Sequence, residues 1–159
     1  MEYSVKIARE LSLSDDEVEM IKYAGLLHDI GKIGVKDVIL SKHGVLTRDE
    51  REEMRNHPKY GAFIMEQVDS LKEIAPLTLY HHERYDGTGY PLGLAGEAIP
   101  LGARILAVAD MYDSMIADRP YRKAFPLETV IKEMKKVSGT QLDPKVVDVF
   151  LAILKREQK

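Results

Sequence analysis

Four of the five histidines of this chain lie in three short motifs that combine metal-binding side chains. The motifs are His28-Asp29, His57-Pro58 and His81-His82-Glu83. Neutral imidazole nitrogens and ionised carboxylates are ligands that Zn, Mn, Fe, Ni and Co ions accept in proteins. Soluble domains rarely concentrate histidine in this way, so the first hypothesis is a metal-dependent hydrolase.

Each motif by itself also has a structural explanation. An isolated His-Asp pair is more often a buried histidine beside a capping aspartate, and His57 alone suits a turn before proline. The adjacent His81 and His82 are harder to explain, because burying two imidazoles without partners costs free energy. Asp110 is also hard to explain, because it lies on the apolar side of its predicted helix, where an unpaired carboxylate costs free energy. His43 has no companion and is expected to be exposed. Jointly, the motif residues favour a metal site.

Apolar residues recur with helical spacing over most of the chain, which predicts an all-α fold in a single domain. Ser14 is expected to cap a helix of about four turns that carries His28 at its buried end. The segment 47–50 reads as a capping box for the next helix. Proline disfavours helical geometry in the preceding residue, so His57 is expected at a helix break before Pro58.

The remaining site residues are assigned to later elements. Helices are expected over 71–83, 101–117, 127–137 and 144–155. The first of them brings His81 and His82 to one side, and the second carries Asp110. Between these two helices lies one long irregular stretch, 84–100, which contains four glycines.

Composition narrows the classes of function. The chain has 159 residues and 45% apolar content, which suits one domain with its own core. The lack of cysteine excludes disulfides, thiolate zinc sites and cysteine nucleophiles. A net charge of -3 gives no basic surface for bulk nucleic-acid binding. No apolar run approaches the ~20 residues that span a bilayer, and no leader is visible, so a cytoplasmic protein without a membrane span is expected.

Several segments, in order, resemble the HD-GYP domains, a branch of the HD phosphohydrolase superfamily. Residues 26–34 are similar to the family's HD segment and 56–62 to its HP segment. The segment from His81 to Pro91 matches the signature that names the family. Residues 106–113, 118–124 and 139–144 complete a pattern that covers nearly the whole chain, 1–159.

The resemblance implies an all-helical bundle that hydrolyses cyclic di-GMP, a bacterial second messenger. The expected product is linear pGpG, in some cases processed further to GMP, and the nucleophile is a hydroxide that bridges two metal ions. Iron or manganese is the usual metal, with Zn, Ni or Co as alternatives. Carried onto this sequence, the metal ligands are His28, Asp29, His57, His81, His82 and Asp110, with Asp29 bridging the two ions.

The resemblance also implies a set of substrate contacts. Asp29 and Lys32 are the residues expected to be catalytic. Lys32 is also expected to place positive charge at the phosphate, together with Arg119 and Arg122. Without the family these cations would be read as solvated surface charges. In the glycine-rich loop, Gly89 and Tyr90 are expected beside the substrate.

Glycine permits close backbone approach to a ligand, and the tyrosine could stack on guanine or contact phosphate. Taken alone, this loop would be interpreted as a tight surface turn. Asp113 follows Asp110 by one helical turn, and it is expected to hold a ligand or an arginine in place.

One feature departs from the family pattern. HD-GYP domains have a further histidine ligand, and in three-metal members a glutamate, on a helix upstream of the HD pair, and this position falls before Met1. The chain is therefore expected to lack the start of its first helix and any upstream regulatory domain. Glu2 is too close to His28 to substitute. The metal bound by His28, Asp29 and Asp110 would therefore lack one nitrogen donor, and no third metal is expected. The ligands of the second metal, Asp29, His57, His81 and His82, are complete.

Two functions from different classes follow. The first is a metal-dependent cyclic dinucleotide phosphodiesterase acting on cyclic di-GMP or cyclic GMP-AMP. The alternative is a catalytically impaired signalling module that binds the cyclic dinucleotide or diguanylate cyclase (GGDEF) domains. A third hypothesis, a nucleotidase that acts on mononucleotides, is weaker, because such an enzyme would not need the signature from His81 to Pro91.

Overall fold

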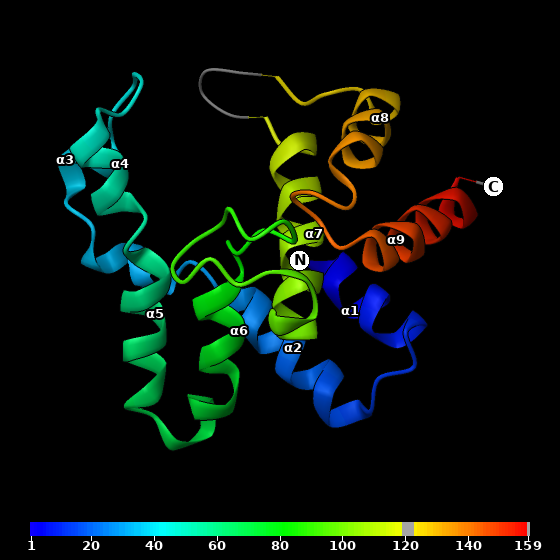
Figure 1. The fold of residues 1–159 in the computed structure, drawn as a ribbon, viewed down its shortest axis with the longest axis horizontal. Helices are drawn as coiled ribbons and strands as arrows, with labels where there is room; N and C mark the ends of the chain where they lie inside the picture. The colour runs from blue at the N-terminus through cyan, green and yellow to red at the C-terminus, as the bar shows by residue number, and fades with distance from the viewer. Residues whose placement is uncertain (119–122, 159) are drawn as a thin grey trace.

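The computed structural model describes residues 1–118 and 123–158, which form a helical bundle without β-strands (Figure 1). This confirms the predicted all-α fold. Within these residues no helix is both long and apolar enough to cross a bilayer. The helices are α1 (Glu2–Glu10), α2 (Asp15–Leu27), α3 (Asp37–Leu40), α4 (Arg48–Met54), α5 (His57–Glu66), α6 (Ala75–Tyr80), α7 (Leu101–Ile116), α8 (Leu127–Val137) and α9 (Pro144–Glu157), with short 3-10 segments η1 (Ile30–Gly34), η2 (Asp69–Ile74) and η3 (Gly96–Ala98).

Helix α7 runs through the middle of the molecule and carries much of the core (Figure 1). Its apolar face, including Ile105 and Leu106, is fully buried. Tyr3 from α1, Tyr112 from α7 and Phe150 from α9 meet edge to face, with ring centroids 4.8–5.3 Å apart. Aromatic pairs in this geometry add to the stabilisation from burial. The two ends of the chain are thereby packed on the same central helix.

Local capping sets the starts of the helices that carry the site. Ser14 and Thr47 each form a complete capping box with the glutamate three residues later, at the start of α2 and α4. Helix α2 ends at Leu27 with His28 as its C-cap. Helix α4 ends at Met54, and α5 begins at His57. The predicted caps and the predicted break before Pro58 are therefore confirmed.

The helix expected over 71–83 is shorter than predicted. Residues Asp69–Ile74 form the 3-10 segment η2, and the α-helix spans only Ala75–Tyr80. Pro76 lies in the first turn of α6, where its missing N–H removes no helical hydrogen bond, so the α-helix starts there. His81 and His82 consequently lie beyond the end of α6 instead of within a helix.

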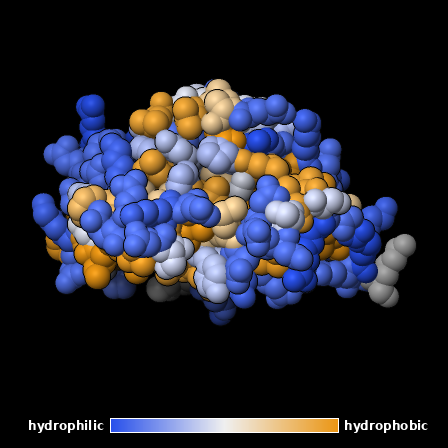
Figure 2. Space-filling model, turned by 90° about the horizontal axis from the view of Figure 1, so that it is seen from below, coloured by the Kyte–Doolittle hydropathy of each residue, from blue (hydrophilic) through white to orange (hydrophobic). Residues whose placement is uncertain are grey.

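The surface mixes polar and apolar side chains. Figure 2 shows hydrophobic residues scattered among hydrophilic ones on the face seen from below. Single exposed apolar side chains are usual on globular surfaces. The site is instead marked by polar groups that are buried, namely His57, His81 and Glu83.

Candidate metal centre

Three site histidines are held in the same way, by the last turn of a helix. The ring Nδ1–H of His28 donates to the Gly25 carbonyl at 2.8 Å, that of His57 to Met54 at 2.8 Å, and that of His81 to Thr78 at 2.6 Å. A carbonyl oxygen can only accept, so the proton lies on Nδ1 and the lone pair on Nε2. A histidine that donates one ring N–H to a carbonyl in this way presents its other ring nitrogen to a metal ion.

The Nε2 atoms of His57 and His81 are buried and have no hydrogen-bond partner among the described residues. Ligand atoms of His57, His81 and His82 all lie within 4.8 Å of one another. Buried acceptors without partners are rare, because each loses its hydration without compensation. A divalent cation would satisfy these nitrogens together, so the residues present fit a metal ion.

The Asp29 carboxylate lies between the histidines of two helices. Its Oδ1 is 3.3 Å from His57 Nε2, and its Oδ2 is 3.4 Å from His28 Nε2. Because both histidines carry their proton on Nδ1, these contacts join pairs of acceptors and are not hydrogen bonds. Two ligands that each lie about 2.1 Å from a cation are about 3.0–3.4 Å apart. The spacing therefore suits a cation between Asp29 and each histidine.

Asp110 completes the group from helix α7. Its Oδ1 lies 3.8 Å from His28 Nε2. The structure thus brings together the six residues expected as ligands. Asp29 lies next to His57, which is grouped with His81 and His82, and next to His28, which Asp110 approaches from α7.

Burial favours the neutral form of His57, His81 and His82. It lowers the pKa of His81 to about 3 and that of His82 to about 2. Burial also lowers the pKa of His57, although its hydrogen bond to Met54 opposes the change. For Asp29, burial raises the pKa, whereas the hydrogen bond from the Lys32 ammonium lowers it, and the resulting pKa lies below its usual value. At neutral pH the cluster is in the protonation state that binds cations.

A close backbone contact brings Asp29 to His57. A Cβ atom on Gly31 in η1 would lie 1.9 Å from the His57 carbonyl oxygen and 2.3 Å from the Gly61 nitrogen. Only glycine permits this approach of η1 to the first turns of α5. The turn after Asp29 is thereby packed directly on the helix that begins with His57.

Lys32 and Tyr90 border the cluster. The Lys32 ammonium donates to Asp29 Oδ2 at 2.6 Å. The Tyr90 ring stacks on His82 with centroids 5.0 Å apart, and the Arg55 guanidinium lies 5.2 Å from its centroid. Burial raises the pKa of Tyr90 to about 12. Tyr90 therefore contacts a candidate ligand, and Arg55 is a neighbour that sequence reasoning missed.

The glycine-rich loop is held by Glu83, which belongs to the third histidine motif but to which the sequence assigned no role. The buried Glu83 carboxylate accepts hydrogen bonds from the backbone N–H groups of Leu92, Gly93 and Leu94, at 2.7–3.1 Å. A Cβ on Gly89 would lie 2.3 Å from the Arg84 nitrogen. In this structure Gly89 thus allows the loop to pack on its own chain. A glutamate directly before a glycine-rich loop was the available signal.

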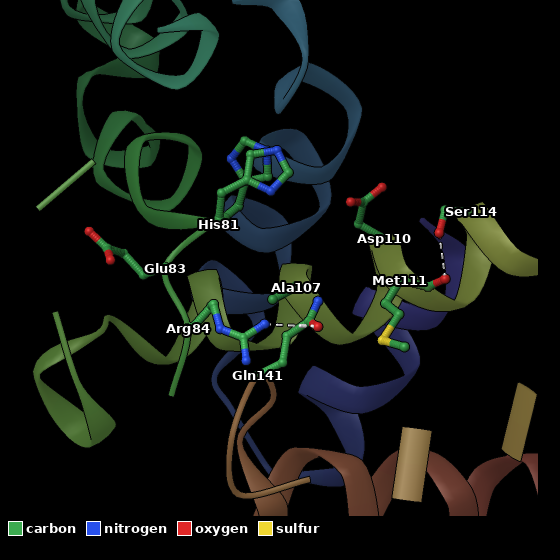
Figure 3. Close-up of a pocket in the computed structure, with 9 residues that line it drawn as sticks. His81, Glu83, Arg84, Ala107, Asp110, Met111, Ser114 and Gln141 are labelled. Atoms are coloured by element: carbon green, nitrogen blue, oxygen red, sulfur yellow. Dashed lines mark hydrogen bonds between the residues drawn. The ribbon is translucent and has the colours of Figure 1, made fainter. Parts of the chain in front are cut away.

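A small hollow of about 180 Å³ lies beside the cluster. Figure 3 shows His81 on one side, Asp110 on α7, and Arg84 hydrogen-bonded to Gln141 from the segment before α9. The distance from Arg84 Nη1 to Gln141 Oε1 is 3.1 Å. Asp110 thus faces this hollow from α7.

Asp113 has a different contact from the one expected. Asp113 accepts a hydrogen bond from the amino group of Met1. Arg119 and Arg122 lie outside the described residues.

Comparisons with known proteins identify the family. The sequence model described as "HD domain" matches residues 1–146. This chain belongs to the HD domain family. Proteins of this family bind divalent metal ions, in agreement with the histidine cluster. The structure is also similar to Bd1817, a HDG"Y"P protein from Bdellovibrio bacteriovorus, with a TM-score of 0.74 and 20% identity over 96% of this chain and 49% of that chain. The expected HD-GYP resemblance is confirmed.

Two curated relatives have names that state an activity. The chain is 44% identical over 147 residues to the "Cyclic di-GMP phosphodiesterase response regulator RpfG" of Xanthomonas campestris, covering 91% of this chain and 39% of the relative. It is 40% identical over 153 residues to the "3'3'-cGAMP-specific phosphodiesterase 3" of Vibrio cholerae, covering 96% of this chain and 33% of the relative. The HD domain chain thus spans well under half of these relatives.

Proposed function

We propose that this HD domain chain is a metal-dependent phosphodiesterase that hydrolyses cyclic di-GMP to linear pGpG. One observation carries the proposal. Asp29 lies between His28 and His57 at 3.3–3.4 Å, in contacts between acceptors that a bound cation would make favourable. The 44% sequence identity between this chain and the cyclic di-GMP phosphodiesterase RpfG supports cyclic di-GMP as the substrate.

The chemistry is divided between the metal ions and the chain. Two divalent ions, of which iron or manganese fit the nitrogen and oxygen donors, would polarise the phosphoryl oxygens and lower the pKa of the attacking water. His57, His81, His82 and Asp29 would hold one ion. His28, Asp29 and Asp110 would hold the other.

Other side chains orient the reaction. Lys32 lies on Asp29, where its ammonium can compensate negative charge at the phosphate while it fixes the carboxylate. Tyr90 covers one face of His82 and limits rotation of that ring. The loop that carries Tyr90 is held by Glu83. The residues that we propose as catalytic are Asp29 and Lys32.

The test uses purified protein loaded with Fe²⁺ or Mn²⁺, with cyclic di-GMP and cyclic GMP-AMP as separate substrates and chromatography of the products. We expect pGpG from cyclic di-GMP. His57→Ala should lower metal affinity by more than about tenfold, because ligand loss exceeds the effect of losing an outer partner. His43→Ala is the matched control, because His43 is exposed and outside the cluster, and it should keep the metal.

Three outcomes would contradict the proposal. Equal metal content in His57→Ala and His43→Ala, by elemental analysis, would refute the metal site. Metal-loaded protein that binds cyclic di-GMP without forming linear product would favour the alternative, a non-catalytic module that binds cyclic dinucleotide or diguanylate cyclase domains. Product from cyclic GMP-AMP alone would reassign the substrate.

A further inference from the structure

A second, larger hollow lies next to the metal centre. Its volume is about 650 Å³, and it is formed by α3, the connection 41–46 and the end of α4. Helices α3 and α4 lie at one edge of the molecule, beyond the start of α5 (Figure 1). Known small-molecule sites occupy about 300–1,000 Å³. This hollow is large enough for part of a nucleotide, whereas the hollow of about 180 Å³ beside Asp110 is below that range.

Two residues connect this hollow to the metal centre. Lys32 lines the hollow, and its ammonium also donates to Asp29 at 2.6 Å. Met54 lines the hollow as well, and its carbonyl accepts the hydrogen bond that orients His57. A ligand with one phosphate at the metal centre would therefore reach the hollow directly past Lys32.

The lining combines an apolar wall with cationic groups. The apolar side chains are Ile39, Leu40, Val45, Leu46 and Met54. Val45 is 85% exposed and Leu40 41% exposed, so this wall faces solvent. Apolar walls with a few convergent polar groups are typical of sites that bind flat organic ligands.

Two polar residues lie at the rim. Lys42 and His43 line the hollow beside the apolar wall. The Lys42 ammonium pairs with Glu50 at 2.5 Å, and Glu50 also accepts from the Thr47 N–H in the capping box of α4. Lys42 is therefore held in place by the start of the helix. An ammonium so placed can donate to a phosphate oxygen or to the O6 and N7 edge of guanine.

We propose that the hollow lined by Lys32, Lys42, His43 and Met54 is a subsite for one purine nucleotide half of a cyclic dinucleotide whose scissile phosphate lies at the metal centre. The inference rests on the proposed function and adds where the second half of the substrate binds. The purine face contacts the apolar wall, and Lys42 and His43 meet its polar edge or the second phosphate. Lys32 lies between the two halves of the ligand.

The decisive variant fills the hollow without touching the metal centre. Val45→Trp places an indole in the hollow, and its exposure makes a folding defect unexpected. Val38→Trp is the matched control, because Val38 is 70% exposed on neighbouring α3 and does not line the hollow. Lys42→Ala is compared in the same way with Lys36→Ala, an exposed lysine outside the hollow.

Binding is measured first in metal-free protein, by adding cyclic di-GMP and recording backbone amide shifts in NMR spectra. We expect saturable shifts in residues 43–46, a dissociation constant raised at least tenfold in Val45→Trp, and no change in Val38→Trp. Catalysis is measured next with the metal-loaded protein. The ratio of kcat/KM for cyclic di-GMP to that for bis(p-nitrophenyl) phosphate, a diester without purines, should fall at least tenfold in Val45→Trp.

The outcomes separate this inference from the proposed function. Normal hydrolysis of cyclic di-GMP with equal kcat/KM ratios in Val45→Trp and Val38→Trp would overturn the subsite and keep the function. Saturable shifts in 43–46 without any hydrolysis would keep the subsite and overturn the function. Absence of shifts in 43–46 on adding cyclic di-GMP would overturn the subsite.

Discussion

The Glu83 side chain directly follows the two adjacent site histidines, but its carboxylate binds the loop backbone instead of joining the cluster. Figure 3 shows it pointing away from His81. Its two oxygens accept three N–H groups, from Leu92 to Leu94, and only 4% of the residue is exposed. The same loop places Tyr90 on His82. One buried carboxylate therefore links loop conformation to the orientation of a candidate ligand.

We expect Glu83→Ala to lower the free energy of unfolding by about 2–3 kcal/mol, because it removes the charged acceptor of three backbone hydrogen bonds. Glu83→Gln should lose less, since its amide oxygen still accepts. The measurement is urea unfolding, together with hydrogen exchange of the Leu92 and Leu94 amides. Glu97→Ala, in the exposed end of the same loop, is the control. Equal unfolding midpoints and exchange rates for Glu83→Ala and Glu97→Ala would rule out the tether.

At the scale of elements, the site depends on how closely η1 approaches α5. Asp29 lies at the end of the turn after α2, and His57 begins a helix that is distant in sequence. The missing side chain of Gly31 lets the two backbones meet. The contact between these elements therefore sets the separation of Asp29 from His57, which is the separation on which the shared carboxylate depends.

Gly31→Ala should lower the free energy of unfolding by about 1–3 kcal/mol, as overpacking does in well-packed cores. It should also reduce metal content, because a Cβ 1.9 Å from the His57 carbonyl must push α5 away from Asp29. Gly44→Ala is the matched control, since a Cβ there would contact nothing within 4 Å. Thermal unfolding and elemental analysis of both variants test this expectation. Similar results for the two substitutions would mean that the contact is not required.

At the scale of the whole molecule, a buried ion pair connects the long loop, α7 and α9. Arg104 donates to the Ile99 carbonyl at 2.9 Å and to Asp143 Oδ2 at 2.5 Å. Asp143 also accepts from the Lys145 N–H and so caps α9. The Asp143 side chain is fully buried. The loop that carries Tyr90 is thereby joined to the C-terminal helix.

Arg104→Ala should lower the free energy of unfolding by about 3–5 kcal/mol, because it leaves the Asp143 carboxylate buried without its charged partner. Lys145→Ala removes an exposed contact with Glu97 and should leave the unfolding midpoint unchanged. Denaturant unfolding of the two variants makes the comparison. A midpoint for Arg104→Ala that equals the wild-type value would show that the pair does not stabilise the molecule.

Local signals explain which parts of the fold were predictable. The capping boxes at Ser14 and Thr47 and the break before Pro58 involve neighbours within a few residues, and all three are confirmed. The helix predicted over 71–83 is too long, because the apolar spacing extends across both the 3-10 segment η2 and the shorter helix α6. Apolar periodicity indicates a buried face, but it does not show whether the backbone is α or 3-10.

The sequence by itself determined which residue types occur and in what order, and these were sufficient to predict the HD-GYP resemblance and a site of histidines and aspartates. Only the tertiary structure decided that His57 and His81 present unpartnered Nε2 atoms, that Asp29 lies between two histidines, and that Glu83 fastens the loop. The physical reason is the separation in sequence between the residues that interact. Capping and turn formation depend on adjacent residues, whereas these contacts depend on backbones that meet only when the helices pack.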